Sequence, residues 1–413
     1  GQLVGLDREQ ISAIERGTRH LRDVRIAARV ASRLLIPPGH LGFGTGATVA
    51  AGGPHGRKVV SWMDRRDFVQ HVAAAALGIA GSAGLDLDRL LTLLPQAEPT
   101  GTRHIGTSDV VAIEQLTAAF VRQDDANGSG LIREAAVAEL HSVLPLLNAQ
   151  VAPEVRPRLM LATAGLAMIA GWTSFDTNKH DAARNLWMIG LDLARHSDHP
   201  QASDLTVYLL YDMALQAIHL GRPKEALNLV RVGEVATVNS QSVSASTTCA
   251  LVGIQARTHA ALGDTAACDR MLGRVEEHFT AIDRTTAPLW GGCLDNTGLA
   301  AYQGRAHYEL TLTSRDSTAA ERAVPLLRKA VDGFGVGYAK SSALNLPDLA
   351  GAHALAGDVD TAVTVGHDAV DAVIAVYSPR AYDRLRLLHS VLEPMHTSPG
   401  VAELRNRLVA TAA

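Results

Sequence analysis

Apolar positions recur with a helical period along most of the chain, in segments separated by short polar turns. From about residue 108 these segments pair into consecutive helical hairpins. Three of the turns align with one another and share a glycine, polar residues after it and a small residue five positions on: LGRPKEAL at 220–227, LGDTAACD at 262–269 and AGDVDTAV at 356–363. The pattern predicts an all-α fold that contains a repeated hairpin unit.

Small residues occupy matching positions on both sides of the three turn glycines. Small side chains let the two helices of a hairpin approach closely, so we expect all of these positions to be buried between helices. The glycines are Gly221, Gly263 and Gly357, with Ala214, Ala256 and Ala350 seven residues before them and Ala226, Cys268 and Ala362 five residues after them.

The repeat resembles the tetratricopeptide repeat (TPR), although its spacings of 42 and 94 residues differ from the usual 34. If 94 represents two units, further hairpins fit at 108–147, 157–196 and 295–333, which makes about six. The more highly charged stretches 382–395 and 403–413 fit the polar cap that ends such arrays. The resemblance implies a TPR-like α-solenoid over residues 108–413, with a concave surface for a peptide, a helix or a partner protein.

Residues 3–43 have the signals of two further helices. Asp7 and Gln10 form a candidate capping box for a helix over 7–16, which stops at Gly17. A second helix fits from Asp23 to about Leu35, before two prolines. Residues 1–70 carry eleven Arg or Lys against six Asp or Glu, a net charge of +5 in a chain whose total is −4. The positive charge of residues 1–70, in a chain that is otherwise acidic, indicates that this segment has a polyanionic partner.

The segment LVGLDREQISAIERG resembles the second half of the helix-turn-helix of the XRE (phage-repressor-like) family. The resemblance implies that helix 7–16 enters the major groove of DNA, and that two copies of the chain bind a near-palindromic operator. The first helix of the motif is missing ahead of Leu3, so we expect a partial domain over residues 1–43. The residues implied to contact double-stranded DNA are Arg8, Glu9, Ser12, Ala13, Arg16, Arg19 and His20.

Residues 44–60 are rich in glycine without periodicity and predict a flexible linker, followed by a connecting helical segment over 61–107. The latter contains Arg65 and Arg66 before an alanine-rich stretch, which imitates a twin-arginine export signal. An internal signal could not serve as an N-terminal address, so we favour a structural helix. Three widely spaced cysteines, Cys249, Cys268 and Cys293, favour buried apolar thiols in a reducing cytoplasm, and no uncharged apolar run is long enough to span a membrane.

No catalytic motif of the nucleophile-elbow, zincin, P-loop or dinucleotide-binding kind occurs in the sequence, so we expect neither an enzyme nor a cofactor. The histidines are too dispersed to indicate a metal site. Two stretches are candidates for a ligand or peptide groove, although aromatic residues in repeats more often fill the core. They supply Trp172, Phe175, Asp176 and Asn178 from GWTSFDTNKHDAARNLW, and Tyr208, Asp212, Gln216 and His219 from one helical face of YLLYDMALQAIH.

Two functions fit these patterns. The first is a cytoplasmic, homodimeric transcriptional regulator that reads DNA and senses a peptide or small-molecule effector through its repeats. The alternative is a TPR-like scaffold for protein partners, with a vestigial helix-turn-helix that does not bind DNA. Neither function requires a membrane.

Overall fold

The structure is a computed structural model that describes residues 104–412, except 241, 284, 286, 287, 289 and 291–293. The chain divides into two compact units, Gly1–Trp62 and Met63–Ala413, and every described residue belongs to the second. The predicted helix-turn-helix segment, the linker and nearly all of the connecting segment therefore lie outside the described residues.

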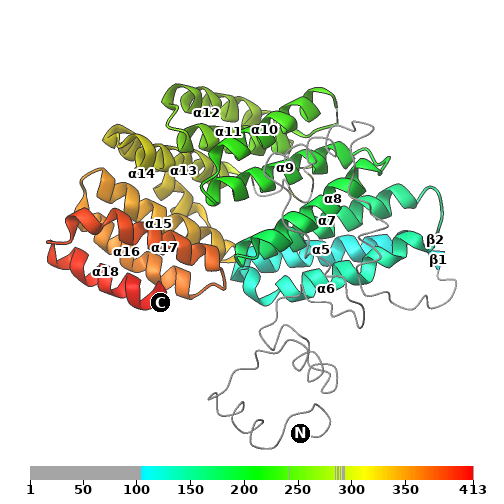
Figure 1. The fold of residues 1–413 in the computed structure, drawn as a ribbon, viewed down its shortest axis with the longest axis horizontal. Coiled ribbons are helices and arrows are strands. Elements are labelled where there is room, and N and C mark those ends of the chain that lie inside the picture. Colours follow the sequence, from blue (N-terminus) through cyan, green and yellow to red (C-terminus); the bar gives the residue numbers. More distant parts are fainter. Residues whose placement is uncertain are drawn as a thin grey trace, which may run out of the picture. The chain divides into compact units, whose positions relative to one another are not determined.

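The described part of the chain is nearly all helical (Figure 1), which confirms the predicted all-α class. Its one departure is a parallel pair of two-residue strands, β1 (His104–Ile105) and β2 (Gln150–Val151). The α-helices are α5 (Thr107–Asn127), α6 (Arg133–Val143), α7 (Arg156–Asp176), α8 (His180–Arg195), α9 (Ala202–His219), α10 (Pro223–Val238), α11 (Ala245–Ala261), α12 (Thr265–Thr280), α13 (Asn296–Ser314), α14 (Ser317–Gly333), α15 (Ala339–Leu355), α16 (Val359–Ile374), α17 (Pro379–Val391) and α18 (Pro399–Ala412). Short 3₁₀ helices are η2 (Ser129–Leu131), η3 (Leu144–Asn148), η5 (Val336–Tyr338) and η6 (Glu393–Met395).

Consecutive helices pack as hairpins: α7 with α8, α9 with α10, α11 with α12, α13 with α14, and α15 with α16. All three turn glycines have positive φ, of 67° at Gly221, 75° at Gly263 and 90° at Gly357. In the α11–α12 turn the Gly263 amide donates to the Ala260 carbonyl and the Asp264 amide to the His259 carbonyl, both at 3.0 Å. This pair of bonds satisfies carbonyls that the end of α11 leaves without partners.

The six small residues around these glycines are fully buried, as the pattern predicts. Two other hairpins use different residues for the same turn. Asn178 after α7 (φ 59°) and Arg315 after α13 (φ 57°) adopt the left-handed conformation. Because neither is glycine, alignment of the turn glycines did not find these two hairpins directly.

The first helices of the hairpins form an inner layer in which each packs against the next: α7, α9, α11, α13 and α15. Helix α5 packs against α7 at one end of this layer and against α15 at the other, so the inner layer closes on itself. In Figure 1 the cyan and orange ends of the array meet at this contact. The closure is also a backbone interaction, because the Tyr377 amide donates to the Asn127 carbonyl (2.9 Å) and the Gly130 amide to the Tyr377 carbonyl (2.8 Å).

Helix α7 is the one described helix with the length and apolar composition of a membrane span. Of its most apolar window, 89% is buried inside the domain. Its composition is therefore explained by packing on all sides, as expected for the core helix of a soluble protein.

Candidate functional site

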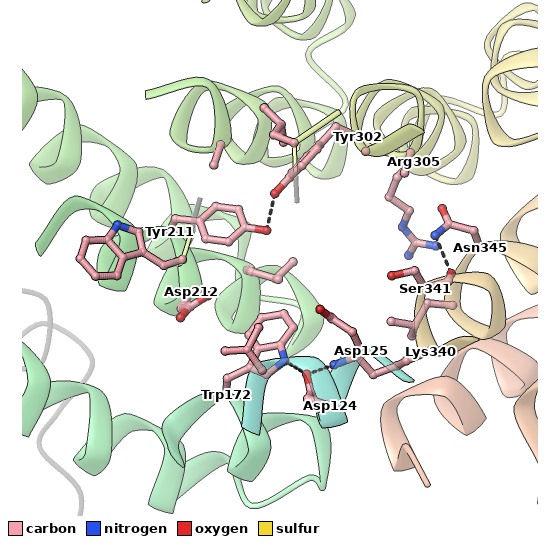
Figure 2. A pocket seen from close by; sticks show the side chains of 18 of the residues that line it. Asp124, Asp125, Trp172, Tyr211, Asp212, Tyr302, Arg305, Lys340, Ser341 and Asn345 are labelled. Atoms are coloured by element: carbon pink, nitrogen blue, oxygen red, sulfur yellow. Dashed lines mark hydrogen bonds and ion pairs between the residues drawn. The ribbon is translucent and has the colours of Figure 1, made fainter. Parts of the chain in front are cut away.

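The closed inner layer surrounds a cavity of about 280 Å³ (Figure 2). Its walls come from the inner helices α5, α7, α9, α11, α13 and α15, together with α17 and the segment between α12 and α13. Because these helices are far apart in the sequence, the cavity exists only when the array is closed. The volume lies slightly below the range of about 300–1,000 Å³ that is usual for small-molecule sites.

One side of the cavity is aromatic. Tyr208 and Tyr211 of α9 have ring centroids 5.1 Å apart, and the Tyr211 hydroxyl lies 2.7 Å from that of Tyr302 on α13. Trp172 of α7 and Trp290 also line the cavity, and their indole N–H groups donate to carboxylates: Trp172 to Asp124 at 2.8 Å and Trp290 to Asp204 at 2.6 Å. These bonds fix the indole rings, so the aromatic surface is held in place before any ligand arrives.

Asp212 is a buried carboxylate on the α9 wall, close to Tyr211 and Trp172 in Figure 2. The residue is 1% exposed, and its Oδ1 atom has no hydrogen-bond partner among the described residues. Burial raises the pKa of Asp212 well above its ordinary value, against the opposing charge of Arg380. Arg380 is itself engaged elsewhere, because its Nε donates to Asp176 Oδ1 at 3.0 Å.

The cations of the cavity wall contact carboxylates of the protein. Arg257 of α11 makes two hydrogen bonds to Glu309 of α13, at 3.0 and 2.7 Å. Arg305 bonds the same Glu309 (2.9 Å) and pairs with Asp348 of α15, and Arg384 of α17 donates to Asp348 at 3.4 Å. These five residues form a continuous ion-pair network across four helices. Although burial raises the pKa of Glu309, the charges of Arg257 and Arg305 outweigh it and hold that pKa below its ordinary value.

The wall opposite α9 joins α5 to α15. Lys340 of α15 forms a buried ion pair with Asp124 of α5, and its ammonium lies 5.3 Å from the centre of the Trp172 ring. Asp125, next in sequence, also lines the cavity. Burial raises the pKa of Asp125 to about 6, opposed by the charge of Lys340 and reinforced by that of Asp124. The residues that join α5 to α15 therefore also place titratable groups in the cavity wall.

A second cavity, of about 290 Å³, adjoins the first and shares Leu215 and four arginines with it. Phe175, His219 and Asp383 line it, and His219 Nε2 lies 3.4 Å from Asp383 Oδ2. Burial raises the pKa of Asp383, but the hydrogen bond from His219 and its charge bring the pKa below its ordinary value. The shared residues are Leu215, Arg257, Arg305, Arg380 and Arg384.

The candidate ligand residues separate into three groups in the structure. Trp172, Tyr208 and Asp212 line the first cavity, and Phe175 and His219 line the second. The other three lie outside both cavities, as the following contacts show. Asp176 is buried against Arg380, Gln216 bonds Arg184 (2.8 Å), and Asn178 forms the turn after α7.

Most of the cavity wall was not expected from the sequence, which predicted only Trp172, Tyr208 and Asp212 of its residues. Tyr302, Arg305, Lys340 and Arg380 come from the C-terminal half of the array, and Asp125 comes from α5. The stretch from 382, expected as a polar cap, belongs to α17, whose Arg380 and Arg384 reach the cavity. Arg380 is buried, and nothing in the sequence around it indicates that burial.

The remaining predictions concern DNA, thiols and metals. The residues implied to contact DNA, Arg8 to His20, lie outside the described residues. Cys249 and Cys268 are buried free thiols, as expected, and burial raises the pKa of each to about 12; Cys293 is not described. Within the described ranges, no group of three or more His, Cys, Asp or Glu side chains has the geometry to hold a metal ion.

In comparisons with known proteins, no family model matches the chain, and no curated protein sequence matches it.

Proposed function

We propose that the chain is a cytoplasmic transcriptional regulator that reads DNA through residues 7–20 and binds a small effector in the cavity of its TPR-like array. The single observation that carries the effector role is the cavity itself, which seven helices of the closed array line and whose wall includes aromatic rings and a buried carboxylate. Pockets with an apolar wall and few fixed polar groups are typical of ligand sites.

The closure supports an effector over a protein partner. A scaffold repeat array presents an open concave surface that a helix or an extended peptide can follow. Here α5 packs against α15, with the Lys340–Asp124 ion pair between them, so the inner layer is closed on itself. A small molecule, or the end of a peptide, fits a cavity of about 280 Å³ better than a folded partner does.

The DNA-reading role rests on the sequence resemblance and on charge. The motif LVGLDREQISAIERG and the net charge of +5 over residues 1–70 are both features of a DNA-binding head. An effector that binds two states of the dimer with different affinity would then shift the population that fits the operator. In this proposal the array also carries the dimer contact, and the chain has no catalytic activity.

The test is a salt-titrated DNA-binding assay, by fluorescence anisotropy, with the full chain and duplexes that tile the genomic region flanking its gene. We expect binding to one duplex that weakens steeply with salt, because phosphate contacts release counterions. Arg8→Ala should weaken it by about 1–3 kcal/mol, the usual contribution of a bidentate guanine contact. The matched control is Arg322→Ala, which removes an exposed arginine on α14.

Equal affinity for all duplexes, or specific binding that Arg8→Ala leaves unchanged, would contradict the assignment of the reading helix. Absence of salt-dependent binding would instead favour the scaffold function, with the array as the interaction surface.

A further inference from the structure

One carboxylate of the first cavity, Asp212, has an oxygen without a hydrogen-bond partner among the described residues. The lining cations Arg257, Arg305 and Arg384 share Glu309 and Asp348, Arg380 bonds Asp176, and Lys340 pairs with Asp124. Each lining cation therefore already contacts a carboxylate of the protein. Asp212, by contrast, has a buried oxygen that no donor among the described residues reaches.

A buried carboxylate without a donor is unfavourable unless it is protonated or meets a cation. Within the described part of the chain, Arg380 is the cation whose charge acts on Asp212. Its guanidinium is held away, because Nε bonds Asp176 and the group lies 4.7 Å from the Trp172 ring centre and 4.9 Å from that of Phe175. The fold therefore holds its own cation on a neighbouring carboxylate and leaves Asp212, a residue of the cavity wall, without a donor to its Oδ1 among the described residues.

The surroundings of Asp212 suit an organic cation. Tyr208 lies one helical turn before it, Tyr211 is adjacent, and Trp172 lines the same side of the cavity. Faces of tyrosine and tryptophan attract ammonium groups, and the rings also offer apolar area to the rest of a ligand. The combination of an aromatic wall with one uncompensated carboxylate is a recognition chemistry for a protonated amine.

We propose that the first cavity binds an organic molecule with a protonated amino group, which pairs with Asp212 while its apolar body packs on Trp172, Tyr208 and Tyr211. This inference rests on the proposed effector role and names the chemical class of the effector. The Nε of Arg384, on another wall, is also buried without an acceptor among the described residues, so an oxygen on the same ligand would gain a hydrogen bond there.

The test uses three probes that share a phenylalkyl body and differ in charge: phenethylamine, 2-phenylethanol and 3-phenylpropionate. Binding to the full chain is followed by tryptophan fluorescence, since Trp172 and Trp290 line the cavity, and by calorimetry. We expect saturable binding of phenethylamine, at least about tenfold tighter than that of the alcohol or the acid, because only the amine pairs with the carboxylate. This comparison needs no variant.

Asp212→Asn should then remove most of the preference for the amine over the alcohol, a loss of about tenfold or more in amine affinity. The matched control is Asp332→Asn, an exposed carboxylate on the outer helix α14, which should change nothing. Thermal unfolding of each variant establishes that it is folded. Ala301→Phe, on α13, fills the cavity and should abolish binding of all three probes.

Tighter binding of the acid than of the amine would overturn the proposal and assign the cavity to anions through its arginines. Equal binding of amine and alcohol, or an amine preference that survives Asp212→Asn, would also overturn it. None of these outcomes depends on DNA. The ligand-binding test can therefore contradict the proposed effector class while the DNA assay supports the regulator function, and the DNA assay can fail while the ligand-binding test succeeds.

Discussion

Lys340 and Asp124 lie 216 residues apart in the sequence and form a buried ion pair, with both side chains almost fully enclosed. The pair joins α15, in the last of the hairpins described above, to α5, the helix that precedes the first of them. Asp124 also accepts hydrogen bonds from Ser129 and from the Trp172 indole, which places the same carboxylate in the closure and in the cavity wall.

Lys340→Met should destabilise the domain by about 3–5 kcal/mol, because it leaves the Asp124 carboxylate buried without its cation. The double variant Lys340→Met, Asp124→Asn should recover a large part of the loss, since it removes the uncompensated charge. The measurement is urea unfolding followed by circular dichroism. As a control, Arg322→Met breaks the exposed pair with Asp269 and should cost no more than about 1 kcal/mol. If Lys340→Met and Arg322→Met lower the free energy of unfolding equally, the closing ion pair contributes little to stability.

Asp125→Asn should stabilise the protein at neutral and alkaline pH. The pKa of Asp125 in the fold, about 6, lies above its ordinary value of 3.8, so the folded state binds this proton more tightly than the unfolded chain does. Ionisation of Asp125 therefore costs stability as the pH rises through 6. At about pH 8 the variant should gain roughly 1–3 kcal/mol in free energy of unfolding, and the gain should vanish near pH 4.

Unfolding free energies across that pH range provide the check, with the exposed Asp360→Asn as control. A gain that does not change with pH would mean that the carboxyl group is not the cause.

Two glycines of α7 should respond to alanine in opposite directions. A Cβ at Gly171 would press into the indole ring of the fully buried Trp187, whereas a Cβ at Gly165 has no neighbour within 4 Å. Gly171→Ala should therefore cost about 1–3 kcal/mol through overpacking. Gly165→Ala should gain up to about 1 kcal/mol, because alanine loses less entropy in a helix. Thermal unfolding of the two variants side by side measures the contrast, and a loss in both would place the packing around α7 in error.

The left-handed turns give a reciprocal pair of variants. Gly263→Ala introduces a Cβ at φ 75° with open space around it, so only backbone strain opposes it, at about 1–2 kcal/mol. Asn178→Gly, at φ 59°, removes such strain and should be neutral or slightly stabilising. Calorimetric unfolding of both variants tests the assignment; destabilisation by Asn178→Gly would indicate that the asparagine side chain has a role beyond the turn.

The features of the fold that are encoded locally could be predicted from the sequence. The helical period, the turn glycine and the small buried residues all act within one hairpin. In the α11–α12 hairpin, Gly263 forms the turn, and Ala256 and Cys268 are the small buried residues. The cavity could be predicted only in part. Trp172, Tyr208 and Asp212 belong to segments that are unusual on their own, and they line it.

Lys340 and Arg380, in contrast, gain their roles only when the array closes. Asp176 bonds an arginine 204 residues away, and no local periodicity reports a contact over that separation. The turns at Asn178 and Arg315 could not be predicted from the glycine pattern either. Both residues adopt the left-handed conformation of the other turns, but neither is glycine.

In an open solenoid each repeat contacts only its neighbours, so stability is a sum along a line and an end repeat can fray or be lost at the cost of one interface. Because α5 packs against α15, the inner layer of this domain has no free end among its hairpins. Loss of any one hairpin breaks two interfaces, and an inserted one would force α5 and α15 apart. The number of repeats is thereby fixed by closure, and the array should unfold as a single cooperative unit instead of unravelling from its ends.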